Sequence, residues 1–157
     1  MPTPPLVAAR FAAVLLLSAI SSSLRTPAFI APSCDQSLWN HVYNPKRLEI
    51  VKQCLTVSGT VTESTADPDG DQHFLVKLDP GQDQLLKKKN RTKKNGTLVA
   101  EIVCANHTKQ KKAKAACAGY TNHIALPAVG AHLKVTGSYV IDTHNGWAEI
   151  HPVSQLQ

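Results

Sequence analysis

The sequence has none of the short motifs that mark the commonest enzyme classes. It contains no G-x-S-x-G nucleophile motif, no glycine-rich phosphate loop and no H-E-x-x-H or H-x-H spacing. Aromatic residues make up only 5% of the 157 residues, so few side chains are available to stack on bases or sugars. These absences favour a small binding domain over an enzyme with a familiar active-site signature.

Acidic residues are absent from positions 1–33, and no apolar run reaches the ~20 residues that span a bilayer. Arg10 precedes the largely apolar run Phe11–Ile20, and three serines follow. This order is typical of a secretory signal peptide. We therefore predict a signal peptide at residues 1–23, with cleavage between 21 and 31. The mature chain is then secreted or periplasmic, in the cell envelope, and has no transmembrane span.

The chain has four cysteines, all beyond the predicted cleavage region, and no C-x2-C pair. An even number of cysteines in an exported protein predicts disulfides. Of the three possible pairings we favour Cys34 with Cys54 and Cys104 with Cys117, because each pair brackets one local segment. A zinc site built from all four thiolates is the alternative, and the missing C-x2-C pair weighs against it.

Hydrophobic alternation predicts a mainly β domain. Residues 34–53 suggest short helical turns, and 82–89 suggest a short helix before an Asn-Gly turn. We expect Pro152 to end the last strand, and residues 105–128 to form a loop or short helix tied by the second disulfide. Period-two patterns predict five strands, at 55–62, 73–78, 97–104, 132–141 and 147–151.

Five short strands, with a glycine inside the first and the fourth, favour a small closed β-barrel over a sandwich. Four segments resemble a group of exported bacterial OB-fold-like proteins to which no activity is assigned. The resemblance covers about residues 54–153 and implies an OB-like barrel domain and an exported location. In the familiar OB order the helix follows the third strand, whereas the helical stretch here precedes it. The segments that carry the resemblance are Val57-x-Gly59-x-Val61, Asp69-Gly70-Asp71-x-His73, Val129-Gly130-x-x-Leu133-x-Val135-x-Gly137 and Gly146-Trp147-x-Glu149-Ile150-His151-Pro152.

Basic residues outnumber acidic ones by 17 to 11, and most of them lie in two tracts. If both tracts share a face, they form a surface for an extended polyanion such as nucleic acid, polysaccharide or lipid headgroups. The scarcity of aromatics in the second and third strands argues against selective binding of single-stranded nucleic acid. Solvated loops that keep an exported protein soluble are the other interpretation. The tract residues are Lys87, Lys88, Lys89, Arg91, Lys93, Lys94, Lys109, Lys111, Lys112 and Lys114.

Histidines at the expected strand ends indicate a different site. His73 opens the second predicted strand, His151 closes the fifth, and His144 lies in the turn before it. With Glu149, or with Asp142 or Asp71, these imidazoles could bind a divalent metal at one end of the barrel. The alternating aspartates at 67, 69 and 71 lack the glycine and glutamate of an EF-hand calcium loop, which favours a turn.

The sequence thus leaves three functional hypotheses. The first is a non-enzymatic OB-like module that binds a polyanion through the basic insertion and needs no cofactor. The second is a metal-binding protein or metal-dependent hydrolase centred on His73, His144 and His151, with Glu149 as base. The third is docking on another envelope protein through Trp147 and Tyr139.

Overall fold

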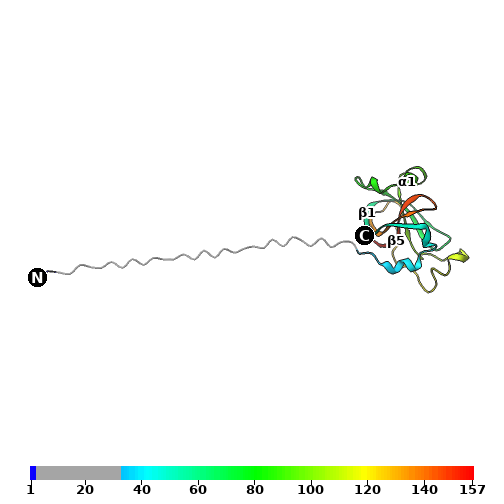
Figure 1. Cartoon of the computed structure of the whole chain (residues 1–157), viewed down its shortest axis with the longest axis horizontal. Helices are drawn as coiled ribbons and strands as arrows, with labels where there is room; N and C mark the ends of the chain where they lie inside the picture. Colours follow the sequence, from blue (N-terminus) through cyan, green and yellow to red (C-terminus); the bar gives the residue numbers. More distant parts are fainter. Residues whose placement is uncertain (3–32) are drawn as a thin grey trace. The chain divides into compact units, whose positions relative to one another are not determined.

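A five-stranded sheet that closes on itself forms the body of the protein (Figure 1). The computed structural model describes residues 1–2 and 33–157, and all statements below concern these residues. The strand order is β1-β2-β3-β5-β4, and β4 pairs back to β1. All neighbours are antiparallel except β3 and β5, which are parallel. The strands are β1 (Leu48–Ala66), β2 (Gln72–Leu78), β3 (Leu98–Ile102), β4 (His132–Asp142) and β5 (Trp147–Leu156).

β1 is long enough to serve two partners. Its first part pairs with β4 and its second part with β2, and Gly59 pairs with both. A Cβ at Gly59 would lie 2.2 Å from the carbonyl oxygen of Lys77 on β2. Only glycine lets the two backbones approach this closely, which explains the glycine inside an otherwise β-branched strand.

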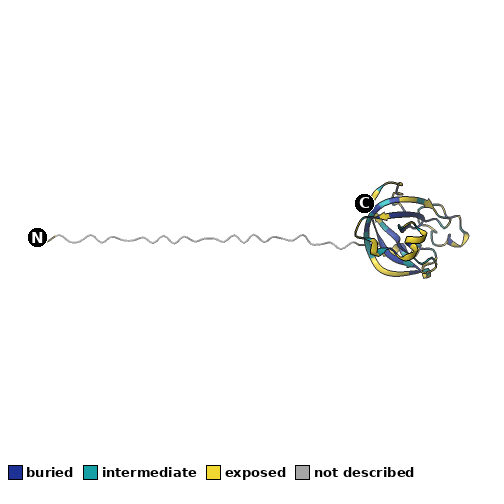
Figure 2. Ribbon diagram, turned by 90° about the horizontal axis from the view of Figure 1, so that it is seen from above, coloured by how far each residue is buried: buried dark blue, intermediate teal, exposed yellow. Residues whose placement is uncertain are grey.

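The inner face of the sheet holds the main core. Phe74 and Val76 of β2, Ile102 of β3 and Ile150 of β5 are fully buried there. Figure 2 shows buried residues concentrated on the strands. Because side chains alternate along a strand, the neighbours of these core residues point to the outer face.

The N-terminal segment covers part of that outer face. It begins with the 3-10 turns η1 (Gln36–His41) and η2 (Pro45–Arg47). Leu38 and Val42 pack with Val103 and Val140 in a second apolar cluster. The helical segment expected at 34–53 is thus shorter than predicted, because β1 already begins at Leu48 and its first residues pair with the end of β4.

Two further expectations differ in detail. Instead of one helix at 82–89, the structure has a 3-10 turn, η3 (Asp83–Leu85), and a helix, α1 (Lys88–Lys93). Pro152 does not end β5, because the strand continues to Leu156. Between the pairs Gly137–Val153 and Tyr139–Ile150 the β4–β5 register shifts, and this bulge accommodates a proline without a ladder hydrogen bond.

Disulfides join Cys34 to Cys54 and Cys104 to Cys117, which is the pairing favoured from the sequence. The second disulfide closes the segment after β3, which contains the 3-10 turn η4 (Lys111–Ala113). Disulfides are consistent with an extracellular or periplasmic protein. Among the described residues, no helix has the length and apolarity required to cross a membrane. Residues 3–32 of the predicted leader and its cleavage region lie outside the described residues.

Candidate functional site

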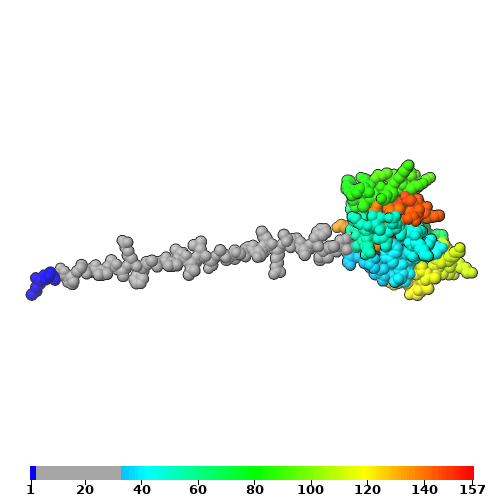
Figure 3. All heavy atoms as spheres, in the orientation of Figure 1, coloured from blue at the N-terminus to red at the C-terminus, as the bar shows by residue number. Residues whose placement is uncertain are grey.

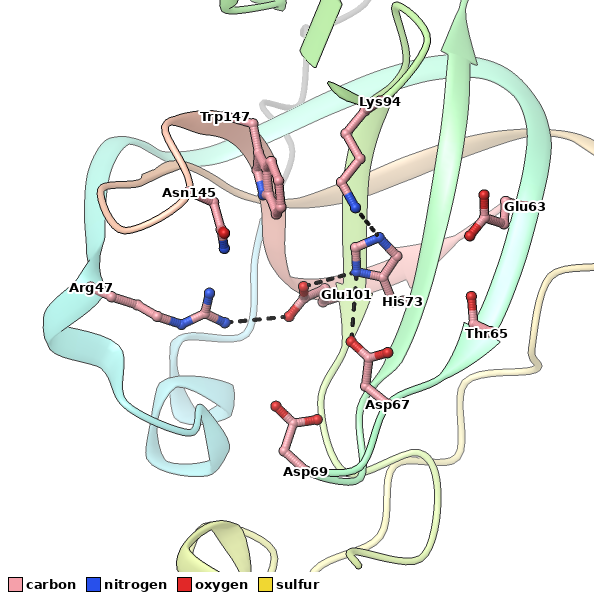
Figure 4. Close-up of a pocket in the computed structure, with 10 residues that line it drawn as sticks. All are labelled: Arg47, Glu63, Thr65, Asp67, Asp69, His73, Lys94, Glu101, Asn145 and Trp147. Atoms are coloured by element: carbon pink, nitrogen blue, oxygen red, sulfur yellow. Dashed lines mark hydrogen bonds and ion pairs between the residues drawn. The ribbon is translucent and has the colours of Figure 1, made fainter. Parts of the chain in front are cut away.

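A polar cleft of about 330 Å³ opens where the β1–β2 turn meets the β4–β5 turn (Figure 4). Its floor comes from the outer faces of β2 and β3, and Lys94, which follows α1, borders one side. Four carboxylate residues line it against two cations, so the cleft is acidic although the protein as a whole is basic. The lining residues are Arg47, Glu63, Thr65, Asp67, Asp69, His73, Lys94, Glu101, Asn145 and Trp147.

His73 lies at the centre of this cleft. It is the register partner of Glu101 on β3, and its Nδ1 lies 3.2 Å from Glu101 Oε1. Asp67, which directly follows β1, has its Oδ2 3.8 Å from the same nitrogen. On the other side of the ring, Lys94 Nζ lies 3.3 Å from Nε2. Burial raises the pKa of Asp67, although His73 opposes this shift.

Glu101 connects the cleft to the interior. Its second oxygen, Oε2, lies 2.9 Å from Nδ1 of His151 and 3.8 Å from a guanidinium nitrogen of Arg47. Burial alone would raise the pKa of Glu101, but His151 and His73 outweigh it and hold the pKa well below its usual range. Glu101 is therefore a buried carboxylate that stays ionised.

Two fully buried residues, Glu149 and His151, lie behind Glu101. His151 Nδ1 also lies 3.3 Å from Glu149 Oε2, and the indole nitrogen of Trp147 donates to Glu149 Oε1. Burial alone would lower the pKa of His151, but Glu101 and Glu149 raise it to about 10. His151 is therefore an imidazolium that compensates two buried carboxylates.

The far nitrogen of this imidazolium faces Asp71. His151 Nε2 and Asp71 Oδ2 lie 3.9 Å apart, and both are buried without a hydrogen-bond partner. The backbone N–H of Cys104 donates to the other oxygen, Oδ1, at 2.8 Å. Burial raises the pKa of Asp71 to about 7, against the opposing effect of His151.

The structure brings together some of the predicted metal or ligand residues and not others. His73, Glu149 and His151 belong to one network through Glu101. His144 is exposed in the β4–β5 turn, where its backbone N–H donates to Asp142, and its side chain is outside this network. Asp142 is not a free ligand either, because it caps that turn and accepts from Arg47.

Sequence reasoning missed Glu101 and Arg47. The alternation of β3 places Glu101 opposite His73, but this pairing is visible only once the β2–β3 register is known. Arg47 comes from the N-terminal segment, and its guanidinium reaches Asp142 on β4, 95 residues away. Burial alone would lower the pKa of Arg47, but Glu101 and Asp142 raise it.

The two basic tracts lie apart on the face of the molecule that Figure 3 draws. Figure 3 shows the green segment with α1 at the top of the molecule and the yellow segment after β3 at the lower right, with other segments between them. The acidic cleft is lined by Lys94 on the α1 side and by Asp69 from the β1–β2 turn. Lys109 of the second tract lies beside the β1–β2 turn, because its backbone N–H donates to the carbonyl of Pro68.

The remaining candidates have structural explanations. The β1–β2 turn is closed by backbone hydrogen bonds from Asp67 to Asp71 and from Gly70 to Asp67, as the turn interpretation of the alternating aspartates requires. Tyr139 is buried in the main core and donates to Leu85, so it does not form a docking surface with Trp147. Comparison with family models, curated proteins and solved structures found no match for this chain.

Proposed function

We propose that this protein is an exported, OB-like barrel domain whose cleft binds a divalent metal ion. The proposal of the fold rests on the strand order, in which β3 and β5 are parallel and β4 closes on β1. OB-folds bind ligands on strands 2 and 3 and on the loops that join strands 1–2 and 4–5. The acidic cleft occupies this position. α1 lies between β2 and β3, which departs from the familiar OB order.

The geometry around His73 carries the metal proposal. Asp67 from the β1–β2 turn, His73 from β2 and Glu101 from β3 place their ligand atoms within 4.8 Å of one another. Metal–ligand bonds of about 2.0–2.2 Å in a tetrahedral site place ligand atoms about 3.3–3.6 Å apart. The observed separations of 3.2 and 3.8 Å from His73 Nδ1 bracket this range.

The charge of the cleft and the groups that orient Glu101 also favour a cation. The carboxylates that line the cleft outnumber its cations. Glu101 is oriented by His151 and Arg47, in the way that outer partners usually hold a metal-ligating carboxylate. One imidazole and two carboxylates suit zinc or manganese, and the open side of the cleft leaves space for water or a further ligand. We propose a binding role rather than a catalytic one.

The test is calorimetric titration of the untagged, disulfide-intact protein with Zn²⁺, together with metal analysis of the purified protein. We expect one Zn²⁺ per chain, and a loss of affinity of at least about 100-fold in His73→Gln, which removes a ligand. Asp67→Asn is the second variant, because its half-exposed side chain makes a folding defect less of a concern. His132→Gln is the matched control, since this exposed histidine pairs with Asp79 away from the cleft. Absence of binding to the wild type at about 0.1 mM Zn²⁺, which corresponds to a binding free energy weaker than about 5.5 kcal/mol, would refute the proposal.

The first basic tract supports a second candidate function, the binding of an anionic polymer. Five of its six cations are exposed, and among the described residues none of these five forms an ion pair. Only Lys94 turns into the cleft. The test is binding to heparin, single-stranded DNA and anionic vesicles across a salt series. We expect salt-sensitive binding that is lost when the five exposed cations become glutamine, and the matched control changes the second tract instead. The residues to change are Lys87, Lys88, Lys89, Arg91 and Lys93, with Lys109, Lys111, Lys112 and Lys114 as the control set.

A further inference from the structure

Lys94 differs from the other lysines of its tract. It directly follows α1, and its backbone N–H donates to the carbonyl of Asn90 in that helix. Its side chain is half-buried, whereas those of Lys87, Lys88 and Lys93 are exposed. Figure 4 shows it extending into the cleft toward His73, beside Trp147. The cleft thus already contains, besides Arg47, the ammonium of Lys94.

The ammonium of Lys94 has two contacts. It lies 3.3 Å from His73 Nε2 and 4.3 Å from the ring centroid of Trp147. An ammonium group only donates hydrogen bonds, so Nε2 must accept. The proton of the neutral imidazole is then on Nδ1, where it is donated to Glu101 Oε1 at 3.2 Å. We assign this tautomer from the contacts on both sides of the ring.

This tautomer blocks the metal position. A metal ion bound between Asp67, His73 and Glu101 needs the lone pair of His73 Nδ1, which carries the proton while Lys94 is in place. When Nδ1 binds the metal, the ring exchanges its proton through water to Nε2 and stays neutral. The new Nε2–H then points at an ammonium group that has no acceptor. The metal and the Lys94 contact therefore exclude one another.

We propose that Lys94 is a built-in competitor that lowers the affinity of the cleft for a divalent cation. This inference rests on the proposed metal-binding function and adds its regulation. A divalent ion must displace the ammonium from His73 and from the face of Trp147. After displacement Lys94 is free to join the exposed cations of α1. Trp147 reports the exchange, because it loses a cation from its ring.

The experiment uses the full chain in a Trp39→Phe background, which leaves Trp147 as the only tryptophan. Zn²⁺ is the probe because it has no redox chemistry. Calorimetry measures affinity, and Trp147 emission is recorded in the same titration. Lys94→Met removes the ammonium, and Lys94→Gln replaces it with a neutral group that can accept from Nε2–H. Lys93→Met is the matched control, since it removes the same charge from an exposed position one residue away.

We expect Lys94→Met and Lys94→Gln to bind Zn²⁺ about tenfold more tightly than the background protein, since a like charge is removed from the site. Lys93→Met should stay within about twofold, because exposed charges are screened. Zn²⁺ should shift Trp147 emission in the background protein and in Lys93→Met, but not in Lys94→Met. If both Lys94 variants bind no tighter than Lys93→Met, or if emission shifts equally in all of them, the competitor role is wrong while metal binding stands. If none of the proteins binds Zn²⁺, the metal-binding function and this inference are both overturned.

Discussion

His151 allows the sharpest test of the buried network. Its imidazolium faces Glu101 at 2.9 Å and Glu149 at 3.3 Å, and its side chain is fully buried. The pKa of His151 is raised to about 10 in the folded protein and lies near 6.5 in the unfolded chain. A raised histidine pKa means that the folded state holds a proton that the unfolded state has released. The stability that this proton contributes is complete below pH 6.5 and is lost as pH rises toward 10.

One proton changes the free energy of unfolding by about 1.4 kcal/mol per pH unit. Between pH 7 and pH 9.5 the wild type should therefore lose about 3 kcal/mol of stability. The described residues contain no free cysteine to titrate in this window. The loss is a large fraction of the roughly 5–15 kcal/mol that keeps a domain folded, so it is readily measured.

Urea unfolding at a series of pH values measures the slope, and NMR of the imidazole ring measures the protonation state directly. His151→Asn keeps a donor near the Nδ1 position without the charge, and it assigns the His151 resonance. This variant should lose about 3–5 kcal/mol at pH 6.5, because buried carboxylates are left without their cation. A flat stability between pH 7 and 9.5, together with a His151 resonance that titrates near pH 6.5, would show that the reasoning is wrong.

Three further predictions concern stability, and urea unfolding measures each. The pKa of Asp71 is raised to about 7 by burial, so the folded protein binds an extra proton between pH 4 and 7 and loses stability as pH rises through this range. Asp71→Asn should remove this slope, so that between pH 4 and pH 7 its stability rises by about 3 kcal/mol relative to that of the wild type, and parallel pH profiles would contradict this. Asn90→Ala should cost about 3–4 kcal/mol, because the buried amide bonds both the N–H and the carbonyl of Ala148, and a loss below 1 kcal/mol would argue against that role. Gly59→Ala should cost at least about 3 kcal/mol, because its Cβ would lie 2.2 Å from the carbonyl of Lys77, and near-wild-type stability would disprove the close approach.

Much of the architecture follows from local patterns. Alternation along each strand identified the residues that form the core, such as Phe74 and Val76, because a strand side chain faces either the core or the outer face. The cysteine spacing led to the observed pairing, because each pair closes a short loop. The predicted ends of the strands were less accurate where long-range pairing extends a strand, as at the start of β1 at Leu48 and in β5 beyond Pro152.

The site was only partly predictable. His73 and His151 were identified by their expected positions at the ends of strands, and Glu149 by its place on the same strand as His151. His144, in the turn before that strand, is outside the network. Local sequence does not distinguish a histidine that points into a cleft from one that points to solvent in a turn. Only the register that places Glu101 opposite His73 makes this distinction.

Periodicity, turn residues and cysteines depend on neighbours in the chain, so the sequence by itself determined the β class, the main strands and the charge of each segment. The tertiary structure decided which charges meet. It separated the two lysine tracts and turned Lys94 away from its neighbours into an acidic cleft. It also buried His151 among carboxylates from β3 and β5, where their field outweighs the cost of desolvation. Electrostatic interactions depend on distance and burial in space, and neither is contained in the order of residues along the chain.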